Sequence, residues 1–253
     1  MCGICGIAKK NSNVSNQELV AMRDTMIHRG PDGEGIYIDQ NIGLGHRRLS
    51  IIDLSDQGKQ PMSTADNRFW ITFNGEIYNY KKLRLQLEKK GIKFKSATDT
   101  EVILYMYKEY GPKMLDYFNG MFAFAIWDRK EKSIFLARDR LGIKPLFYYI
   151  DDNNFYFASE IKALDRYINK LNINTEKISE LLIFRSVAGQ DTPYEKIKRL
   201  LPGHYMKWEK SGISIKKWWD LSEKVKLNKN KSFDNYTNWF KTAFDKSVQY
   251  RLI

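Results

Sequence analysis

The sequence predicts an α+β protein in which antiparallel sheets are covered by helices. Three observations predict this class: short segments with alternating apolar residues follow one another, polar turns join several of them, and helical patterns stand between the groups. The regular strand–helix alternation of a doubly wound parallel fold is not found. A chain of 253 residues with 43% hydrophobic residues is long enough to bury one sizeable core.

Six segments combine alternation with β-branched and aromatic side chains, and we expect them to be strands. They are residues 2–8, 42–52, 69–73, 121–127, 133–137 and 155–158. The polar segments 128–132 and 151–154 have the composition of turns between antiparallel neighbours.

Helix signals interleave with these strands. Ser15 with Glu18, and Thr98 with Glu101, form the pattern in which a hydroxyl side chain caps the start of a helix. Apolar residues at helical spacing follow both patterns. A third helix is expected over about 80–91, and a strongly amphipathic one over 233–253.

Composition excludes several classes of protein. No apolar stretch approaches the roughly 18 residues of a membrane-spanning helix, and the N-terminus lacks a secretory signal, so we expect a cytoplasmic location and no membrane contact. Two cysteines cannot form a disulfide scaffold. The net charge of +12 makes nucleic acid a candidate partner, but 29 lysines against 13 arginines are typical of solvated surface.

The C-terminal part of the chain differs from the rest. Residues 224–232 are polar and without periodicity, and the helix after them carries an apolar stripe that no later residue can cover. We therefore expect a domain over 2–210, a linker over 211–232, and the first helix of a missing domain at 233–253. On this ground we expect the chain to be part of a larger protein.

Cys2 follows the initiator methionine, which processing can remove when the second side chain is small. The thiol would then lie beside a free α-amino group, whose ordinary pKa of about 7.7–8.0 leaves it partly unprotonated at neutral pH. That amine can serve as a general base without a histidine. As alternatives, Cys2 and Cys5 could be small buried hydrophobes or a redox or zinc pair. A closed zinc site needs four ligands, so no metal site is expected.

Eight motifs occur in order along residues 2–210. They are MCGICGIA at the N-terminus, HRGPDGEG at 28–35, HRRLSIIDL at 46–54, FNGEIYN at 73–79, GMFAFAIWD at 120–128, RDRLGIKPLFY at 138–148, SEIKAL at 159–164 and LLPGHYMKW at 200–208. Together they closely resemble the class II glutamine amidotransferases, above all the glutaminase domain of asparagine synthetases. The resemblance implies the N-terminal nucleophile hydrolase fold, two antiparallel sheets between helical layers.

The resemblance also implies an activity, the hydrolysis of L-glutamine to L-glutamate and ammonia through a thioester on Cys2. It implies that the α-amino group of Cys2 moves the proton, and that Asn74 and Gly75 donate hydrogen bonds to the oxyanion of the tetrahedral intermediate. From the residues alone, an isolated pair such as Asn74–Gly75 is more typical of a hairpin turn, and the family's register of the motif at 73–79 favours the site.

The charged groups of glutamine need partners as well. The resemblance implies that Arg48 binds the α-carboxylate as a bidentate fork and that Glu76 and Asp99 receive the α-ammonium. Without it, Asp99 is explained by the helix dipole and Glu76 by a solvated surface. Arg47 should point to the opposite face of its strand, at the surface or in a supporting position.

Other motif residues receive no catalytic role. Residues 28–32 should form a turn that shapes the pocket, and Arg138 with Asp139 should form an ion pair at a strand end. Residues 141–146 are expected to face the second domain, where an ammonia passage would begin.

The ammonia would serve an ATP-dependent synthetase domain that converts aspartate to asparagine, making the whole protein an asparagine-biosynthesis ligase. These residues contain no SGGxDS loop, so ATP and Mg are expected only in that domain and no cofactor in this one. One alternative is an amidotransferase that aminates a sugar or secondary metabolite. Others are a nucleic-acid-binding protein using the basic segment 196–231, which is disfavoured, and a pseudo-enzyme subunit. A homodimer is left open.

Overall fold

The computed structural model describes residues 1–253 except 52, 54, 169–170, 224–231 and 253. Its strands fall into two sheets. The first holds β1 (Gly3–Lys9), β2 (Gly33–Asp39), β3 (Ile42–Arg48), β8 (Phe147–Ile150), β9 (Asn154–Ala158) and β10 (Ile197–Arg199). The second holds β4 (Met62–Ser63), β5 (Phe69–Ile77), β6 (Gly120–Asp128), β7 (Ser133–Arg138), β11 (His204–Glu209) and β12 (Gly212–Lys217).

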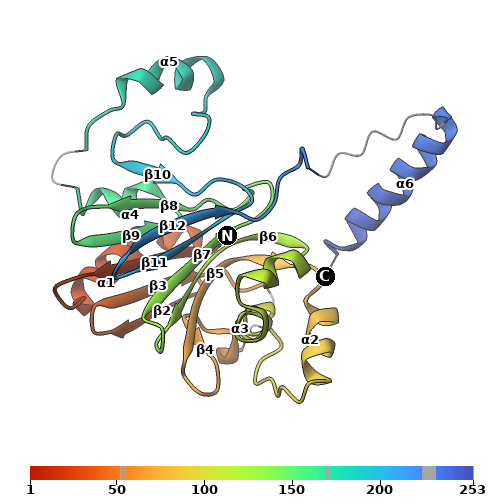
Figure 1. Ribbon diagram of the computed structural model, residues 1–253, viewed down its shortest axis with the longest axis horizontal. Helices are drawn as coiled ribbons and strands as arrows, with labels where there is room; N and C mark the ends of the chain where they lie inside the picture. The colour runs from red at the N-terminus through yellow and green to blue at the C-terminus, as the bar shows by residue number, and fades with distance from the viewer. Residues whose placement is uncertain (52, 54, 169–170, 224–231, 253) are drawn as a thin grey trace.

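Both sheets are antiparallel and six-stranded in the described residues, in the orders β10-β8-β9-β1-β3-β2 and β12-β11-β7-β6-β5-β4. α1 (Asn16–Asp24) and α4 (Ile161–Asp165) cover the first sheet, and α2 (Tyr80–Glu88) and α3 (Asp99–Tyr110) cover the second (Figure 1). The α+β class and the sandwich between helical layers are thus confirmed.

Successive side chains of a strand point to opposite faces, so β1 packs against a different hydrophobic core on each face. In β1, Ile4 and Ala8 face the core between the sheets, whereas Cys5 and Ile7 face the core under α1. Cys5 is fully buried there and behaves as a small hydrophobe, and burial raises the pKa of its thiol to about 12. β1 therefore lies in the middle of the sandwich, so the residue before it is held at a fixed place.

The predicted helix starts are confirmed. Ser15 Oγ accepts a hydrogen bond from the Glu18 backbone N–H at 3.1 Å, and Thr98 Oγ1 accepts one from that of Glu101 at 3.3 Å. The carboxylate of Glu101 does not return to Thr98 but accepts from the Ser96 backbone N–H at 2.7 Å. This bond fixes the turn before α3, which carries Asp99 at its first position.

The predicted strand segments all overlap observed strands, and the two predicted turns join β6 to β7 and β8 to β9. The strand expected over 42–52 ends at Arg48, and residue 52 lies outside the described residues. Six strands were missed, namely β2, β4, β8, β10, β11 and β12. β4 and β10 are very short, and β2 and β12 are edge strands with half-exposed or exposed residues, so their hydrophobic patterns are weak.

The prediction that the linker begins at residue 211 is wrong, because the strand β12 lies within the range 211–232. β12 pairs with β11 as the edge of the second sheet, and Ile213 packs against the core between the sheets. The Trp218 backbone N–H donates to Gly203 O at 2.8 Å, which holds the chain just beyond the strand. The sheet thus extends to Lys217, while 224–231 lie outside the described residues.

Beyond that segment, α6 (Phe233–Gln249) confirms the amphipathic helix, and Figure 1 shows it standing away from the sheets. Its large apolar side chains, such as Trp239 and Phe240, are exposed. That α6 opens a further domain stays a prediction. In the described part of the chain, no helix has the length and apolar character needed to cross a membrane.

Candidate active site

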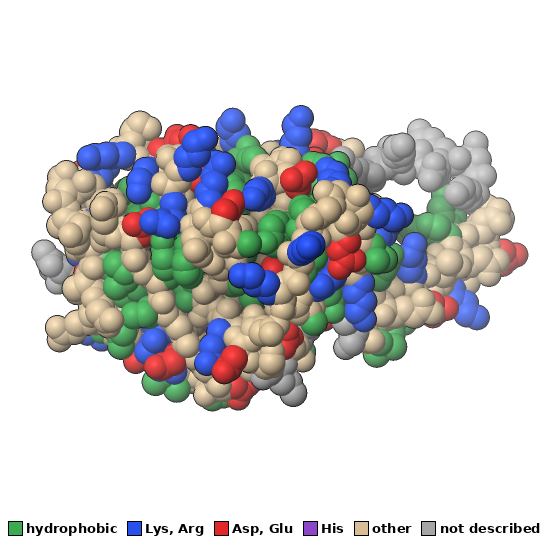
Figure 2. Space-filling view, turned by 90° about the horizontal axis from the view of Figure 1, so that it is seen from below, with side chains coloured by type: hydrophobic (Ala, Val, Ile, Leu, Met, Phe, Trp, Pro, Cys, Tyr) green, Lys and Arg blue, Asp and Glu red, His purple; other side chains and the backbone are tan. Residues whose placement is uncertain are grey.

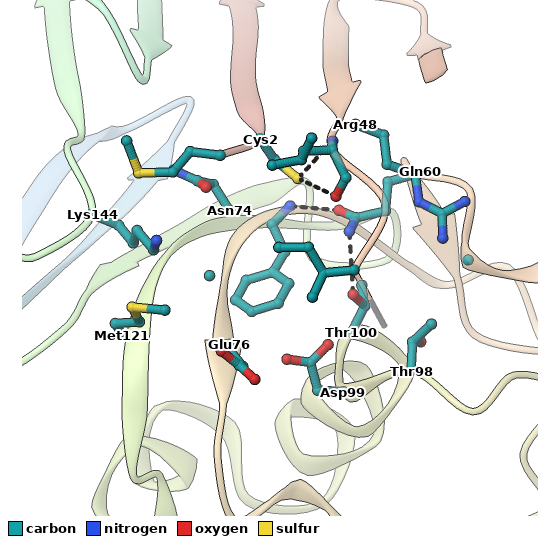
Figure 3. A pocket seen from close by; sticks show the side chains of 16 residues that line it. Cys2, Arg48, Gln60, Asn74, Glu76, Thr98, Asp99, Thr100, Met121 and Lys144 are labelled. Atoms are coloured by element: carbon teal, nitrogen blue, oxygen red, sulfur yellow. Dashed lines mark hydrogen bonds between the residues drawn. The ribbon is translucent and has the colours of Figure 1, made fainter. Parts of the chain in front are cut away.

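The ends of three central strands open into one pocket of about 280 Å³ between the sheets and the start of α3 (Figure 3). Its lining includes all six residues that the sequence predicts as site residues: Cys2, Arg48, Asn74, Gly75, Glu76 and Asp99. Cys2 precedes β1, Arg48 ends β3, and the 74–76 segment lies near the end of β5. Residues far apart in the sequence therefore meet because their strands are neighbours in the sandwich.

Cys2 is held at the pocket wall by two segments. The Leu49 backbone N–H donates to Cys2 Sγ at 3.4 Å, and the thiol donates to Leu49 O at 3.7 Å. Arg29 Nε donates to Cys2 O at 2.9 Å, and Arg29 Nη1 pairs with Glu160 at 3.0 Å. The turn at 28–32 thus anchors the backbone of Cys2.

Burial raises the pKa of the Cys2 thiol above its ordinary value, although the Leu49 backbone hydrogen bond and nearby positive charges act in the opposite direction. Burial also lowers the pKa of the Met1 α-amino group, which lies at the same pocket. No histidine stands among the residues that line the pocket, whereas Met1, which carries the α-amino group, does.

Asn74 is 1% exposed, and its side-chain Nδ2 has no hydrogen-bond partner among the described residues. A buried amide donor without a partner costs about 1–3 kcal/mol, so its presence beside a thiol needs an explanation. Figure 3 shows Asn74 and Cys2 on the same side of the pocket. The arrangement leaves a fixed donor for an acceptor that enters the pocket.

Asn74 and Gly75 are not a hairpin turn. They lie within β5 and pair with Ala123 and Phe122 of β6, which excludes the alternative interpretation of an Asn-Gly pair. A Cβ atom at position 75 would stand 2.3 Å from Met121 O, so only glycine permits this approach of the two strands.

Glu76 and Asp99 face each other across the lower part of the pocket (Figure 3). Asp99 is 4% exposed and accepts a hydrogen bond from the Ile77 backbone N–H at 2.9 Å. Burial, with the Glu76 charge as a smaller cause, raises the pKa of Asp99 to about 7, and burial raises the pKa of Glu76 as well. A buried carboxylate beside a half-buried one, neither in an ion pair with a Lys or Arg of the described residues, favours a cationic ligand.

The Arg48 guanidinium lines the pocket but binds the loop at 53–58. Its Nη1 donates to Ser55 O at 3.1 Å, and its Nη2 donates to Asp53 O. Arg47 points to the opposite face of β3, as predicted, but it is buried in ion pairs with Asp24 at 2.6 Å and Glu34 at 2.8 Å. Of the two predicted positions, at the surface or in a supporting place, this burial excludes the surface.

Gln60 and Lys144 are among the pocket residues that the sequence analysis did not single out. Gln60 is buried, and its Oε1 accepts from the Phe73 backbone N–H at 2.7 Å while its Nε2 donates to Thr100 Oγ1 at 3.2 Å. It therefore ties β5 to the start of α3 beneath the site. Lys144 belongs to the motif at 138–148, and only the motif as a whole could have drawn attention to it.

The ion pair predicted between Arg138 and Asp139 is not formed, because both side chains bind backbone groups. Arg138 donates to the carbonyls of Gly142 at 2.7 Å, Lys144 at 2.8 Å and Leu200 at 2.6 Å. Successive strand residues point in opposite directions, so adjacent positions at the end of β7 are poorly placed to pair.

Known proteins resemble the chain as follows. Residues 1–219 match the family described as glutamine amidotransferase domain. The chain is 42% identical over 207 residues to asparagine synthetase (glutamine-hydrolyzing) 1 of Bacillus subtilis, a match covering 80% of this chain and 33% of that protein. It is 33% identical over 241 residues to the amidase chry2 of Gibberella zeae, covering 93% of this chain and 35% of that protein.

A solved structure shares the fold. The glutamine phosphoribosylpyrophosphate amidotransferase from B. subtilis, complexed with ADP and GMP, matches with a TM-score of 0.65 at 20% identity. The match covers 91% of this chain and 50% of that one. The chain spans about a third of the length of the two curated relatives described above.

Proposed function

This chain belongs to the glutamine amidotransferase domain family, and from that premise we propose that it hydrolyses L-glutamine through a thioester on Cys2. The observation that carries the proposal is the unpaired, buried Nδ2 of Asn74 beside the thiol. It supplies a hydrogen-bond donor fixed in advance where the carbonyl oxygen of a bound amide would become negatively charged.

The reaction starts once Met1 has been removed and the α-amino group belongs to Cys2. The Cys2 sulfur attacks the side-chain amide carbon of glutamine while the amine takes the thiol proton. The resulting oxyanion accepts hydrogen bonds from Asn74 Nδ2 and the Gly75 backbone N–H. The amine then returns the proton to the leaving nitrogen, ammonia departs, and water cleaves the thioester to give glutamate and the free thiol.

The remaining pocket residues select glutamine. Asp99 and Glu76 would receive the α-ammonium, because a bound cation relieves the cost of burying these two carboxylates. Arg48 would bind the α-carboxylate, with its guanidinium held in place by the carbonyls of Asp53 and Ser55. Opposite charges at fixed distances from the thiol would distinguish glutamine from simple amides.

For the whole protein, we propose that the ammonia serves an ATP-dependent synthetase domain that makes asparagine from aspartate. The similarity to a glutamine-hydrolyzing asparagine synthetase at 42% identity supports this acceptor. ATP, Mg and aspartate would bind in that domain. A second candidate is amination of a sugar or secondary metabolite, which the similarity to a fungal amidase favours.

Nucleic-acid binding receives less support. Figure 2 shows Lys and Arg side chains interspersed with Asp and Glu over one face of the molecule, rather than gathered in a stripe. In the basic segment, Lys207 pairs with Glu209 at 2.7 Å and Lys217 with Asp220. Such pairs lower the net charge available to phosphates.

The test is glutamate release from glutamine by three forms of the chain: wild type with Met1 removed, Cys2→Ala, and a form extended at its N-terminus. Mass spectrometry first establishes the N-terminal residue of each. We expect release by the wild type and none by the other two, because one lacks the thiol and the other the free amine. Equal release by the extended form would contradict the role of the α-amino group.

A further inference from the structure

The loop after β7 is held from both sides by two buried, charged side chains. Asp139 accepts hydrogen bonds from the backbone N–H groups of Leu141 at 3.1 Å, Ile143 at 2.9 Å and Lys144 at 3.0 Å. Arg138 donates to three carbonyls, and one of them is that of Lys144. Both the N–H and the C=O of Lys144 are therefore fixed, so its side chain leaves the backbone at a defined point.

That side chain enters the active-site pocket. Lys144 is 7% exposed, lines the pocket together with Cys2 and Glu76, and points its ammonium toward the interior in Figure 3. Lysine is rarely buried without a partner. In the described part of the chain, no carboxylate oxygen lies within 4.0 Å of its nitrogen. A buried ammonium that forms no ion pair is available to act on the groups around it.

The charge of Lys144 reaches both reactive groups of the N-terminus. It favours the ionised Cys2 thiol, against the burial that raises the pKa of that thiol. It also adds to the burial that lowers the pKa of the Met1 α-amino group, one residue before the amine that Cys2 would carry after Met1 is removed. Burial lowers the pKa of Lys144 itself, whereas a negative charge on Cys2 would raise it. A positive charge here favours the nucleophilic sulfur and the neutral amine at the same time.

We propose that Lys144 is a positioning residue for the hydrolysis, one whose buried ammonium stabilises negative charge on the Cys2 sulfur and keeps the neighbouring amine neutral. This inference rests on the proposed function, and it assigns a purpose to the motif at 138–148: Arg138 and Asp139 hold the loop, and the loop presents Lys144. It differs from a role in substrate binding, because the group acted upon is the nucleophile and not glutamine.

The first test measures alkylation of Cys2 by iodoacetamide as a function of pH, which needs no turnover. Lys144→Met removes the charge and Lys144→Arg keeps it. Lys113→Met removes the same charge from an exposed position in the 3-10 helix Gly111–Tyr117, outside the pocket. We expect Lys144→Met to react about three- to tenfold more slowly at pH 7 and to need a higher pH for half-maximal rate. Lys144→Arg and Lys113→Met should stay within about twofold of the wild type.

The second test separates kcat from KM for glutamine. We expect Lys144→Met to lose kcat in the proportion by which alkylation slows, with KM within about twofold of the wild type. A rise in KM with unchanged kcat and unchanged alkylation would overturn the proposal and assign Lys144 to substrate binding. Alkylation equal to wild type at every pH would overturn it as well.

Two measures keep the outcomes distinct. Thermal unfolding identifies a variant that does not fold, and Lys144→Gln then replaces Lys144→Met as a neutral variant that keeps a polar end. If the wild type hydrolyses no glutamine but its alkylation depends on Lys144, the proposed function fails while the effect of Lys144 on the thiol stands. If the wild type is active and no variant changes either readout, the proposed function stands and the role of Lys144 fails.

Discussion

Two buried aspartates differ in what their carboxylates contact: one binds the backbone of a loop, and the other lies in the pocket, where we propose that it binds a ligand. Asp139 is 1% exposed and accepts hydrogen bonds from four backbone N–H groups, those of Phe122, Leu141, Ile143 and Lys144. Asp99 is 4% exposed, accepts from Ile77, and lies near the charge of Glu76. Asp139 is satisfied by the fold, whereas Asp99 lines the pocket, where we propose that it receives a cation.

The comparison extends to the donors. Arg138 binds three carbonyls and fixes a loop, while Asn74 Nδ2, also buried, has no partner among the described residues. Other buried nitrogens without a partner, such as Arg140 Nε and Arg199 Nε, lie outside the pocket, whereas Asn74 lines it. An unpaired buried donor that also lines a pocket is placed to bind an acceptor on a ligand.

The largest effect should come from removing the unpaired donor. Asn74→Ala takes away a proposed oxyanion donor but no hydrogen bond of the folded chain, so kcat should fall about 10²- to 10³-fold while the midpoint of urea unfolding stays unchanged or rises. Steady-state kinetics and urea unfolding measure the two quantities. A loss of stability that accounts for the loss of kcat would mean that Asn74 is structural.

Removing Asp139, whose carboxylate is fully hydrogen-bonded, should lower stability first, in contrast to Asn74→Ala. Asp139→Ala leaves four buried backbone N–H groups without their acceptor, and the free energy of unfolding should fall by about 3 kcal/mol. Urea unfolding at pH 7 checks this, with the exposed Asp152→Ala as control. A change below about 1 kcal/mol would show that the loop finds other acceptors.

The smallest effect concerns Asp99 and pH. Its pKa is raised from 3.8 to about 7, so the folded chain holds this proton more tightly than the unfolded chain, and stability falls as pH rises from about 4 to about 7. Asp99→Asn removes this loss and should raise the Tm by a few degrees at pH 8 but not at pH 4, while raising KM for glutamine. Thermal unfolding at both pH values decides, and an equal shift at pH 4 would contradict the assignment.

Sequence reasoning predicted what short patterns encode. The starts of α1 and α3 followed from Ser15 and Thr98, and β1 and β6 from regular alternation. β2 and β12 were not predicted, because an edge strand needs no apolar face on its exposed side and its hydrophobic alternation is therefore weak. The start of the linker was misplaced for the same reason.

The site was predictable where residues belong to collinear motifs and unpredictable where a single polar residue acts through distant partners. Gln60 binds Phe73 and Thr100, 13 and 40 residues away, and no local signal announces such contacts. The supposed Arg138–Asp139 ion pair failed because sequence adjacency of opposite charges does not show where each side chain points. Only the fold reveals that both bind backbone.

The central claim is that Cys2 is a nucleophile placed in a pocket made for glutamine. The most direct measurement is labelling of the Met1-free chain with a diazo-ketone analogue of glutamine, with the modified peptide identified by mass spectrometry. The structure predicts modification of Cys2 alone, suppressed by excess glutamine, because Cys5 is fully buried. Labelling that glutamine does not suppress, or none in a folded chain whose first residue is Cys2, would contradict the claim.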